Sequence, residues 1–436
     1  MKIEDKYKLS RYNAFYRDGG VLYVWNTYSD ALVKLDKNGQ EYIQSFQGIE
    51  DKSYEFNLLK SNGFIVYEQI DEFGRICLQE KQALFSNNPE DLTLVITPGM
   101  GCNFSCNYCF QTGVDKSGVM TTETAEKVAE YICCQLEINP SIRKLHIKWF
   151  GGEPLLYVNI IEIISHKIVD YTQKNGIKYG ASIITNGRFL DSKVLTVLKE
   201  CDIEMAQITL DGTRKIFCES KGALSEDFDC VINNICNATE TIKISVRLNI
   251  PNNDANEAIA ITDYILSQRK LLNKNIVYFA YVCDYLASAN DSQQAYIKYV
   301  QNYIKWLDYM IDHYDINDIK TKIQNRKRRT TSCCHIKSHN ICIGPYGEMY
   351  KCDHCFGDSS KIIGNIWQGR LFNDAEMKYY TTIDDSLKEK CSQCEYLPLC
   401  IGECANDWVR GFFKIDCKAH KQLLFKLKLL EGGVRI

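Results

Sequence analysis

Short apolar runs alternate with amphipathic stretches through the middle of this chain. Between residues 91 and 285, runs rich in Val, Ile and Leu are each followed by a stretch with helical periodicity. Because consecutive strands separated by helices favour parallel pairing, this pattern predicts a parallel α/β sheet. The expected strands cover residues 92–97, 144–149, 181–185, 205–210, 243–250 and 276–282. The helix expected at residues 122–136 has Thr121 or Thr122 as its N-cap.

The segments on either side of this core have different patterns. Residues 21–26 and 31–35 alternate like short strands around a turn, helical patches follow at 39–47 and 53–62, and residues 64–67 close with a strand. Aromatic residues at helical offsets between 292 and 325 indicate a packed amphipathic helix rather than a cofactor site. We therefore divide the chain into four regions, at residues 1–90, 91–290, 291–332 (a helical bridge) and 333–436.

Composition narrows the function classes. The chain has 436 residues, of which 45% are hydrophobic, and this length favours two or three domains with a sizeable core. The net charge of −3 gives no indication of nucleic-acid binding. The N-terminus has no apolar segment typical of a signal peptide and no run is long enough to span a membrane, so we expect a cytoplasmic protein. The 21 cysteines then indicate metal or redox chemistry rather than disulfides.

The motif with the most chemical information is C-x3-C-x2-C, formed by Cys102, Cys106 and Cys109. It follows the strand expected at 92–97 and a stretch containing Pro98 and two glycines, which places it on a loop. Three thiolates can hold three irons of a [4Fe–4S] cube and leave the fourth iron open, and an open metal position is typical of catalysis. The alternative is a helix with cysteines on one face, because the spacing also fits helical geometry.

This loop closely resembles the signature of the radical S-adenosylmethionine (SAM) enzymes, including the aromatic Tyr108 before the last cysteine. The resemblance implies that SAM chelates the open iron, and that one electron from the cluster splits SAM into methionine and a 5′-deoxyadenosyl radical. That radical takes a hydrogen atom from an unactivated C–H bond. The family also implies a partial six-unit (β/α)6 barrel and an external one-electron donor of the flavodoxin or ferredoxin type.

Further residues match the family's SAM pocket. Gly151, Gly152 and Glu153 are similar to its glycine-glycine-glutamate-proline motif, whose backbone and carboxylate contact the amino group of SAM. The resemblance implies that Thr185, Asp211 and Arg247 also lie near SAM, and Arg247 could pair with the SAM carboxylate through its forked donors. Turn formation or surface pairing is the alternative role for each of them.

The C-terminal cysteines form a second set. Cys391-x2-Cys394-x5-Cys400-x3-Cys404 and Cys417 follow Cys334-x12-Gly347-x4-Cys352, a pattern that resembles the SPASM domain with its two auxiliary [4Fe–4S] clusters. By this resemblance one auxiliary cluster has the ligands Cys391, Cys394, Cys400 and Cys417. The other has the ligands Cys334, Cys352 and Cys404. Its fourth ligand stays open between Cys333, Cys342 and a substrate thiolate, and a zinc ribbon is the alternative for the whole region.

The resemblance extends to possible substrates. Residues 1–90 resemble the winged-helix-like domain that binds leader peptides, which would add a strand to an exposed sheet edge; a structural cap is the alternative. Asp353, directly after Cys352, matches an aspartate that acts as a base in the sulfatase-maturing members of the group. A plain surface carboxylate is equally compatible with its position.

The sequence therefore predicts an α/β radical SAM/SPASM enzyme that binds a ribosomally synthesised precursor peptide. It would abstract hydrogen and install a thioether or carbon–carbon cross-link. The alternative activity is anaerobic sulfatase-type maturation to formylglycine. The alternative of another class is a non-catalytic iron–sulfur electron carrier or sensor, against which the open iron and the glycine-rich pocket argue.

Overall fold

The largest sheet of the computed structural model has six parallel strands that neighbour one another in chain order. The structure describes residues 6–51, 53–268, 271, 276–282, 289–314, 328–386, 391–402, 404–410 and 416–434. The six strands are β6 (Asp91–Ile96), β7 (Lys144–Trp149), β8 (Lys178–Thr185), β9 (Ile203–Leu210), β10 (Lys243–Leu248) and β11 (Val277–Phe279). The predicted parallel α/β sheet is confirmed.

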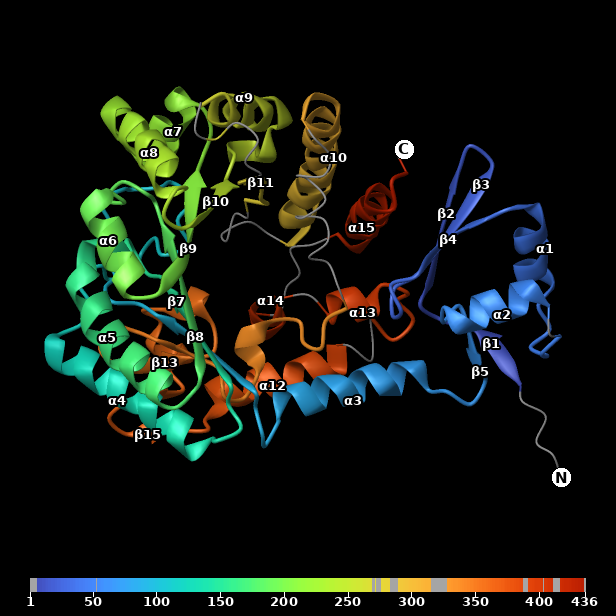
Figure 1. The fold of residues 1–436 in the computed structure, drawn as a ribbon, viewed down its shortest axis with the longest axis horizontal. Helices are drawn as coiled ribbons and strands as arrows, with labels where there is room; N and C mark the ends of the chain where they lie inside the picture. Colours follow the sequence, from blue (N-terminus) through green and yellow to red (C-terminus); the bar gives the residue numbers. More distant parts are fainter. Residues whose placement is uncertain are drawn as a thin grey trace.

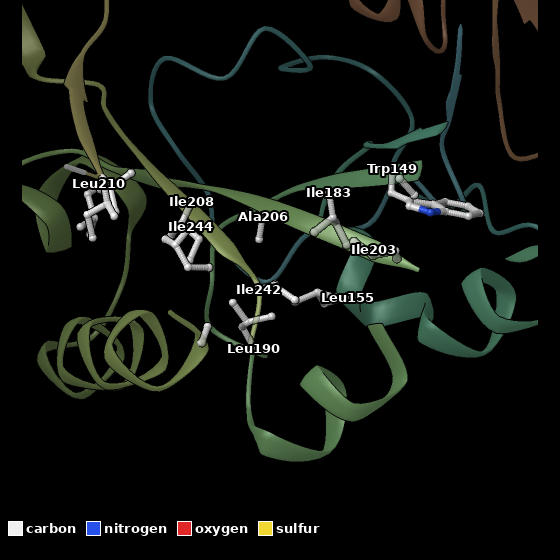
Figure 2. Close-up of a cluster of buried hydrophobic side chains, with 14 of the residues drawn as sticks. Trp149, Leu155, Ile183, Leu190, Ile203, Ala206, Ile208, Leu210, Ile242 and Ile244 are labelled. Carbon is white, nitrogen blue, oxygen red and sulfur yellow. The ribbon is translucent and has the colours of Figure 1, made fainter. Parts of the chain in front are cut away.

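Helices cover the outer face of this sheet (Figure 1). They are α4 (Thr122–Ile138), α5 (Val158–Lys174), α6 (Ser192–Glu200), α7 (Arg214–Lys221), α8 (Ser225–Ala238) and α9 (Ala255–Leu266). The Thr121 hydroxyl caps α4 by accepting from the backbone N–H of Thr124 at 3.1 Å. Between sheet and helices, β-branched strand residues such as Ile183 and Ile208 pack into a buried apolar layer (Figure 2). This layer explains why the strands are rich in Val and Ile.

The sheet does not end at β6. The strand β12 (Ile341–Ile343) pairs in parallel with β6, and three antiparallel strands continue the sheet beyond it. These are β13 (Glu348–Tyr350), β14 (Gly364–Asn365) and β15 (Gly369–Arg370). The first strands of the cysteine-rich region are thus continuous with the barrel sheet.

The N-terminal residues form two small sheets and three helices. The pair β1 (Tyr7–Leu9) and β5 (Ile65–Tyr67) is separate from the sheet of β2 (Asn13–Asp18), β3 (Val21–Asn26) and β4 (Leu32–Leu35). The helices are α1 (Lys37–Ser45), α2 (Tyr54–Ser61) and α3 (Glu72–Leu84). The strands at 21–26 and 31–35 and both helical patches were predicted; β1, β2 and α3 were not.

The remaining helices connect these parts. The helix α10 (Ala289–His313) buries Tyr296, Tyr299 and Trp306, as the helical spacing of its aromatic residues predicts. The bridge predicted at 291–332 includes residues 315–327, which lie outside the described residues. The C-terminal helices are α12 (Asp374–Ser386), α13 (Leu397–Cys400), α14 (Ala405–Arg410) and α15 (Cys417–Glu431). Among the helices of the described residues, none is both long and apolar enough to cross a bilayer.

Candidate active site

The three cysteines of the C-x3-C-x2-C motif lie on an irregular loop that follows the carboxyl end of β6. The end of α7 anchors this loop, because the N–H groups of Ser105 and Asn107 donate to the carbonyls of Lys221 and Ser220 at 2.9 and 3.0 Å. A turn in which the Cys109 N–H donates to the Cys106 carbonyl at 3.2 Å brings these two residues together. The loop prediction is confirmed, and the helical alternative is wrong.

The Gly151-Gly152 pair packs directly on this loop. A Cβ atom on Gly152 would lie 2.2 Å from the carbonyl oxygen of Gly101, and Gly151 has a φ of +135° that side chains rarely adopt. The next N–H, of Glu153, donates to the same Gly101 carbonyl at 2.8 Å. The two glycines therefore allow the β7 loop to form backbone contacts with the cysteine loop.

Glu153 is fully buried, and its carboxylate organises the end of β8. One oxygen accepts from the Thr185 hydroxyl at 2.7 Å and the Leu155 N–H at 3.0 Å, and the other accepts from the Asn186 N–H at 2.8 Å. Burial raises the pKa of Glu153 despite these donors. The structure thus brings together two predicted site residues, Glu153 and Thr185, directly beneath the cysteine loop.

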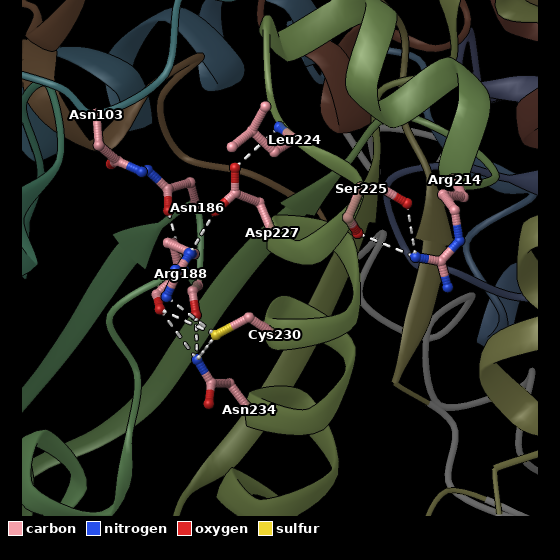
Figure 3. A network of polar contacts seen from close by, with 10 residues as sticks. Asn103, Asn186, Arg188, Arg214, Leu224, Ser225, Asp227, Cys230 and Asn234 are labelled. Carbon is pink, nitrogen blue, oxygen red and sulfur yellow. Dashed lines mark hydrogen bonds and ion pairs between the residues drawn. The ribbon is translucent and has the colours of Figure 1, made fainter.

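Asn186 extends this contact towards the cysteine loop, and Figure 3 shows its side chain between Asn103 and Arg188. Its side-chain amide donates to the Asn103 side chain at 2.8 Å and points at the Cys102 sulfur from 3.9 Å. The side-chain carbonyl oxygen of Asn186 accepts from the backbone N–H of Arg188. The Arg188 guanidinium pairs in turn with Asp227 on α8. Sequence analysis did not select Asn186, although its place in a Thr-Asn-Gly turn at a strand end is the signal that could have identified it.

Tyr108 and Asp211 form a buried polar cluster with Lys221, a residue that sequence analysis missed. The Tyr108 hydroxyl lies 2.8 Å from both carboxylate oxygens of Asp211, and the Lys221 ammonium lies 3.3 Å from Asp211 and 3.9 Å from the Cys106 sulfur. Burial raises the pKa of Asp211. Lys221 ends a helix ahead of a glycine, where a lysine is common, so its sequence context gave no signal.

Arg247 lies apart from this cluster. It is half-buried near the carboxyl end of β10, in register with Thr209 and Tyr278 of the neighbouring strands, and its Nε donates to Asn249 at 2.9 Å. Its guanidinium is at the same edge of the sheet as the cysteine loop, which is the edge where ligands bind in parallel sheets. Its predicted role toward the SAM carboxylate stays a prediction.

The C-terminal cysteines lie mainly on turns and short helices, from Cys333 ahead of β12 to Cys417 at the start of α15. Cys333, Cys352, Cys391 and Cys394 pack against one apolar cluster that includes Ile336, Tyr379 and Leu397. Cys333 and Cys334 place their sulfurs, with a nitrogen of His335, within 4.8 Å of one another. Cys400 ends α13, Cys404 precedes α14 and Cys417 begins α15. Cys342 is fully buried in the middle of β12.

Cys355 is a third residue that sequence analysis missed. It forms a C-x2-C pair with Cys352 and is 6% exposed, with its sulfur 3.6 Å from the Tyr379 hydroxyl and 3.7 Å from the Asn406 side chain. Its N–H donates to the Cys352 carbonyl at 3.0 Å, which is the turn that also joins Cys391 to Cys394. The C-x2-C spacing was visible in the sequence and could have identified it.

Asp353 connects the C-terminal cysteine region to the barrel sheet. The Lys148 ammonium from β7 donates to its carboxylate at 2.8 Å, and a ring nitrogen of His335 lies 3.9 Å away. Burial alone would raise the pKa of Asp353, but the charges of Lys148 and the nearby histidines lower it to about 2. Asp353 is therefore held as a carboxylate.

An aromatic stack lies next to this ion pair, with the Lys148 ammonium 5.9 Å from the centre of the Phe150 ring. The ring of Phe110, next to Cys109, stacks on Phe150 at 5.9 Å and on His354 at 4.4 Å between ring centroids. The loop after β6 is therefore in direct contact with the turn that carries Cys352 and Cys355.

The comparisons with known proteins agree with this geometry. The radical SAM superfamily model matches residues 96–265. The radical SAM cyclopropyl synthase TigE of Paramaledivibacter caminithermalis is 24% identical, over 98% of this chain and 96% of that protein. The cysteine-type anaerobic sulfatase-maturating enzyme of Clostridium novyi is 25% identical, over 72% of this chain and 88% of that protein.

A solved structure shares the fold. Native anSMEcpe with bound AdoMet and Kp18Cys peptide aligns with a TM-score of 0.59 and 17% identity, over 79% of this chain and 100% of that chain. A radical SAM domain requires a [4Fe–4S] cluster and SAM. The loop fits such a cluster, because its donors are three thiols and because Asn186 and Lys221 direct N–H groups at two of the sulfurs, as cluster sites commonly do.

Proposed function

Because this chain contains a radical SAM domain, we propose that it is an enzyme that abstracts hydrogen from a ribosomally synthesised precursor peptide and installs a cross-link in it. The observation that carries this proposal is the position of the N-terminal module, residues 6–84, which packs directly on the cysteine-rich turn around Cys394. A module at that place can deliver a peptide to both cysteine sets.

Three contacts define how the module docks. The Thr27 hydroxyl donates to the Glu395 carbonyl at 2.5 Å, and the Arg11 guanidinium donates to the Gln393 side chain at 2.9 Å. The buried Trp25 ring contacts the ring of Tyr396 edge-on, with 5.8 Å between centroids. These contacts support a role beyond a distant cap, because they join the module to residues on either side of Cys394.

The module has a free strand edge that can receive a peptide. A two-residue turn at Gly19-Gly20 joins β2 to β3 and makes Asp18 and Val21 a hydrogen-bonded pair. Hydrogen-bonded and non-hydrogen-bonded pairs alternate along an antiparallel ladder, so the backbone N–H and C=O groups of Phe15 and Arg17 point away from β3. Among the described residues these groups have no hydrogen-bond partner. An extended leader segment would satisfy them by adding a strand.

A cavity of about 340 Å³ lies beside this edge. It is lined by Phe15, Tyr16, Arg17, Leu22, Gln40, Ile43 and Gln44, which belong to β2, β3 and α1. Phe15 is 50% exposed there, unusually open for a phenylalanine. We infer that an apolar side chain of the leader occupies this cavity while its backbone pairs with β2.

We further infer that the predicted SAM-binding residues and both auxiliary sites are functional. The radical SAM cluster and SAM would supply a hydrogen-abstracting 5′-deoxyadenosyl radical. Joining two carbons of the peptide removes two hydrogens: one leaves as an atom to that radical, and the other leaves as a proton and an electron. The electron would pass to an auxiliary cluster, and the Lys148–Asp353 pair joins β7 of the barrel to the turn that carries Cys352.

The carbon–carbon alternative is favoured over a thioether. TigE is described as a cyclopropyl synthase, and a cyclopropyl ring contains only carbon atoms. The similarity to TigE covers almost the whole of both chains. The precursor peptide would thus lose two hydrogens without losing or gaining any other atom.

The test uses reconstituted protein with SAM, a low-potential reductant and short peptides encoded beside its gene. Mass spectrometry should show a peptide that has lost two hydrogens, with 5′-deoxyadenosine formed in proportion. A variant in which Cys102, Cys106 and Cys109 are all alanine should give neither product. Steady 5′-deoxyadenosine formation without change in any of these peptides would contradict the proposed substrate class.

Sulfatase-type maturation is the second candidate, and Asp353 favours it. Its carboxylate is ionised, 13% exposed and held by Lys148, which suits a base acting beside an auxiliary cluster. The Clostridium novyi relative is described as a maturase of this kind. Formation of formylglycine from a cysteine in a sulfatase-derived peptide, and not in the neighbouring peptides, would establish this activity instead.

A further inference from the structure

Lys221 is the most completely buried lysine beside the cysteine loop, with 2% of its side chain exposed. Its ammonium lies 3.9 Å from the Cys106 sulfur, 3.4 Å from the Tyr108 hydroxyl and 3.3 Å from an oxygen of Asp211. The ammonium nitrogen lies 6.0 Å from the centre of the Phe104 ring and 5.7 Å from the centre of the Phe217 ring. An ammonium group is costly to bury, so it persists in such a place only where anionic partners surround it.

Its main anionic partner is Asp211, which is also fully buried. Both carboxylate oxygens of Asp211 lie 2.8 Å from the Tyr108 hydroxyl, which is its second polar partner. The two groups form a buried ion pair, with 3.3 Å between the Lys221 ammonium and a carboxylate oxygen of Asp211, beside the Cys106 sulfur.

We propose that Lys221 and Asp211 are positioning residues that set the reduction potential of the cluster held by Cys106. This inference rests on the proposed assignment of Cys102, Cys106 and Cys109 as cluster ligands. A reduced cluster carries one more negative charge than an oxidised one, so a fixed ammonium near its sulfur stabilises the reduced form and raises the potential. Asp211 acts in the opposite direction from a position one group further away. Hydrogen bonds and charges near the sulfurs are known to tune such potentials.

The loop does not depend on the Lys221 side chain for its path. The carbonyls of Ser220 and Lys221 hold it through backbone bonds, and a Cβ on Gly222 would lie 2.3 Å from the Ser105 hydroxyl oxygen, so the helix end and the loop are in close contact there. Replacing the side chain thus removes a charge while the backbone anchors remain. A potential shift can then be separated from loss of the loop.

The test is a redox titration of the full chain followed by electron paramagnetic resonance. The spectrum of the Cys102, Cys106 and Cys109 triple alanine variant is subtracted, so that only the loop cluster is measured. Lys221→Gln should shift the midpoint potential to a more negative value, and Asp211→Asn should shift it to a more positive value. Lys221→Arg should stay close to wild type, since it keeps the charge. The control Lys215→Gln, on the same helix but 81% exposed, should cause no shift.

Iron content separates the outcomes. With iron equal to wild type, shifts of opposite sign for the two variants establish the proposal, and unchanged potentials or shifts of the same sign overturn it. If Lys221→Gln loses the cluster, the variant Lys221→Arg decides. Wild-type iron content and midpoint potential in Lys221→Arg support the role of the charge, and a changed potential overturns the proposal. A wild-type protein without a SAM-responsive cluster would instead contradict the ligand assignment. If the protein modifies no peptide, the proposed function fails, but the measured potentials still decide the role of Lys221 and Asp211.

Discussion

The cysteine loop depends on residues that act locally along the chain and on residues that reach it only through the fold. The spacing of Cys102, Cys106 and Cys109 and the Gly-Gly-Glu triplet were readable because each constrains the backbone or supplies a ligand locally. Lys221 was not readable, because its partners Cys106 and Asp211 are distant in sequence and meet it only through the fold. Cys355 was overlooked although its C-x2-C spacing was visible.

The close approach at Gly152 gives a prediction at this scale. In Gly152→Ala the new methyl group would collide with the backbone oxygens of Met100 and Gly101, which cannot rotate away. We expect a destabilisation of about 1–3 kcal/mol, localised to the cysteine loop, and reduced iron in the loop site. Iron assay and 5′-deoxyadenosine formation measure this. Gly180→Ala, whose Cβ would have only an ordinary contact at 3.9 Å, is the control. Full iron and activity in Gly152→Ala would show that the loop can shift freely.

Cys355 gives a second prediction, that it is the fourth ligand of the auxiliary cluster assigned to Cys334, Cys352 and Cys404. Cys342 is the weaker candidate because it is fully buried between two paired strands. Cys355→Ala should therefore lose up to about four irons per chain, one cube, while the loop cluster remains. The exposed Cys134 on α4 supplies the control variant Cys134→Ala. Retention of iron in Cys355→Ala and its loss in Cys333→Ala would assign the position to Cys333.

At the scale of elements, strands with clear apolar runs were predicted well, and strands without such a run were missed. The strands β6 to β10 each have six residues or more and gave clear apolar runs. The strand β12 has three residues, Ile-Cys-Ile, which fit many structures, so its pairing with β6 could not be predicted. The strand β2 was missed because its polar and charged residues resemble a loop, which is also why its outer edge stays open to solvent.

The open edge of β2 gives the third prediction. Phe15→Asp places a charge in the cavity between β2 and α1, where an apolar leader side chain would have to lie. We expect at least a tenfold weaker affinity for the leader peptide, because an unpaired charge would be buried on binding. Calorimetry on the full chain measures this. Tyr54→Asp, at a residue that is 75% exposed on α2, is the matched control. Equal affinity for both variants would move the leader site away from β2.

Across the whole molecule, the N-terminal module and the barrel both contact the cysteine-rich region. The sheet joins the barrel to the C-terminal strands, Lys148 pairs with Asp353 across them, and the N-terminal module contacts the turn around Cys394. None of these contacts leaves a signal in local sequence patterns, because each joins residues that are far apart along the chain. The contacts between these regions could therefore be found only in the structure.

This packing predicts that deletion of residues 1–90 lowers the iron content of the C-terminal cysteine set but not that of the cysteine loop. The deletion removes Trp25 and Thr27, which would expose Tyr396 and Phe425 and free the turn between Cys391 and Cys394. The cysteine loop keeps its anchors on α7 and β7, all of which follow residue 91. We therefore expect loss of auxiliary iron and of peptide modification, with 5′-deoxyadenosine still formed from SAM. The milder variant Trp25→Ala should lose less auxiliary iron in the full chain. Complete auxiliary iron after the deletion would show that the module only delivers the peptide and does not stabilise the cysteine-rich turn.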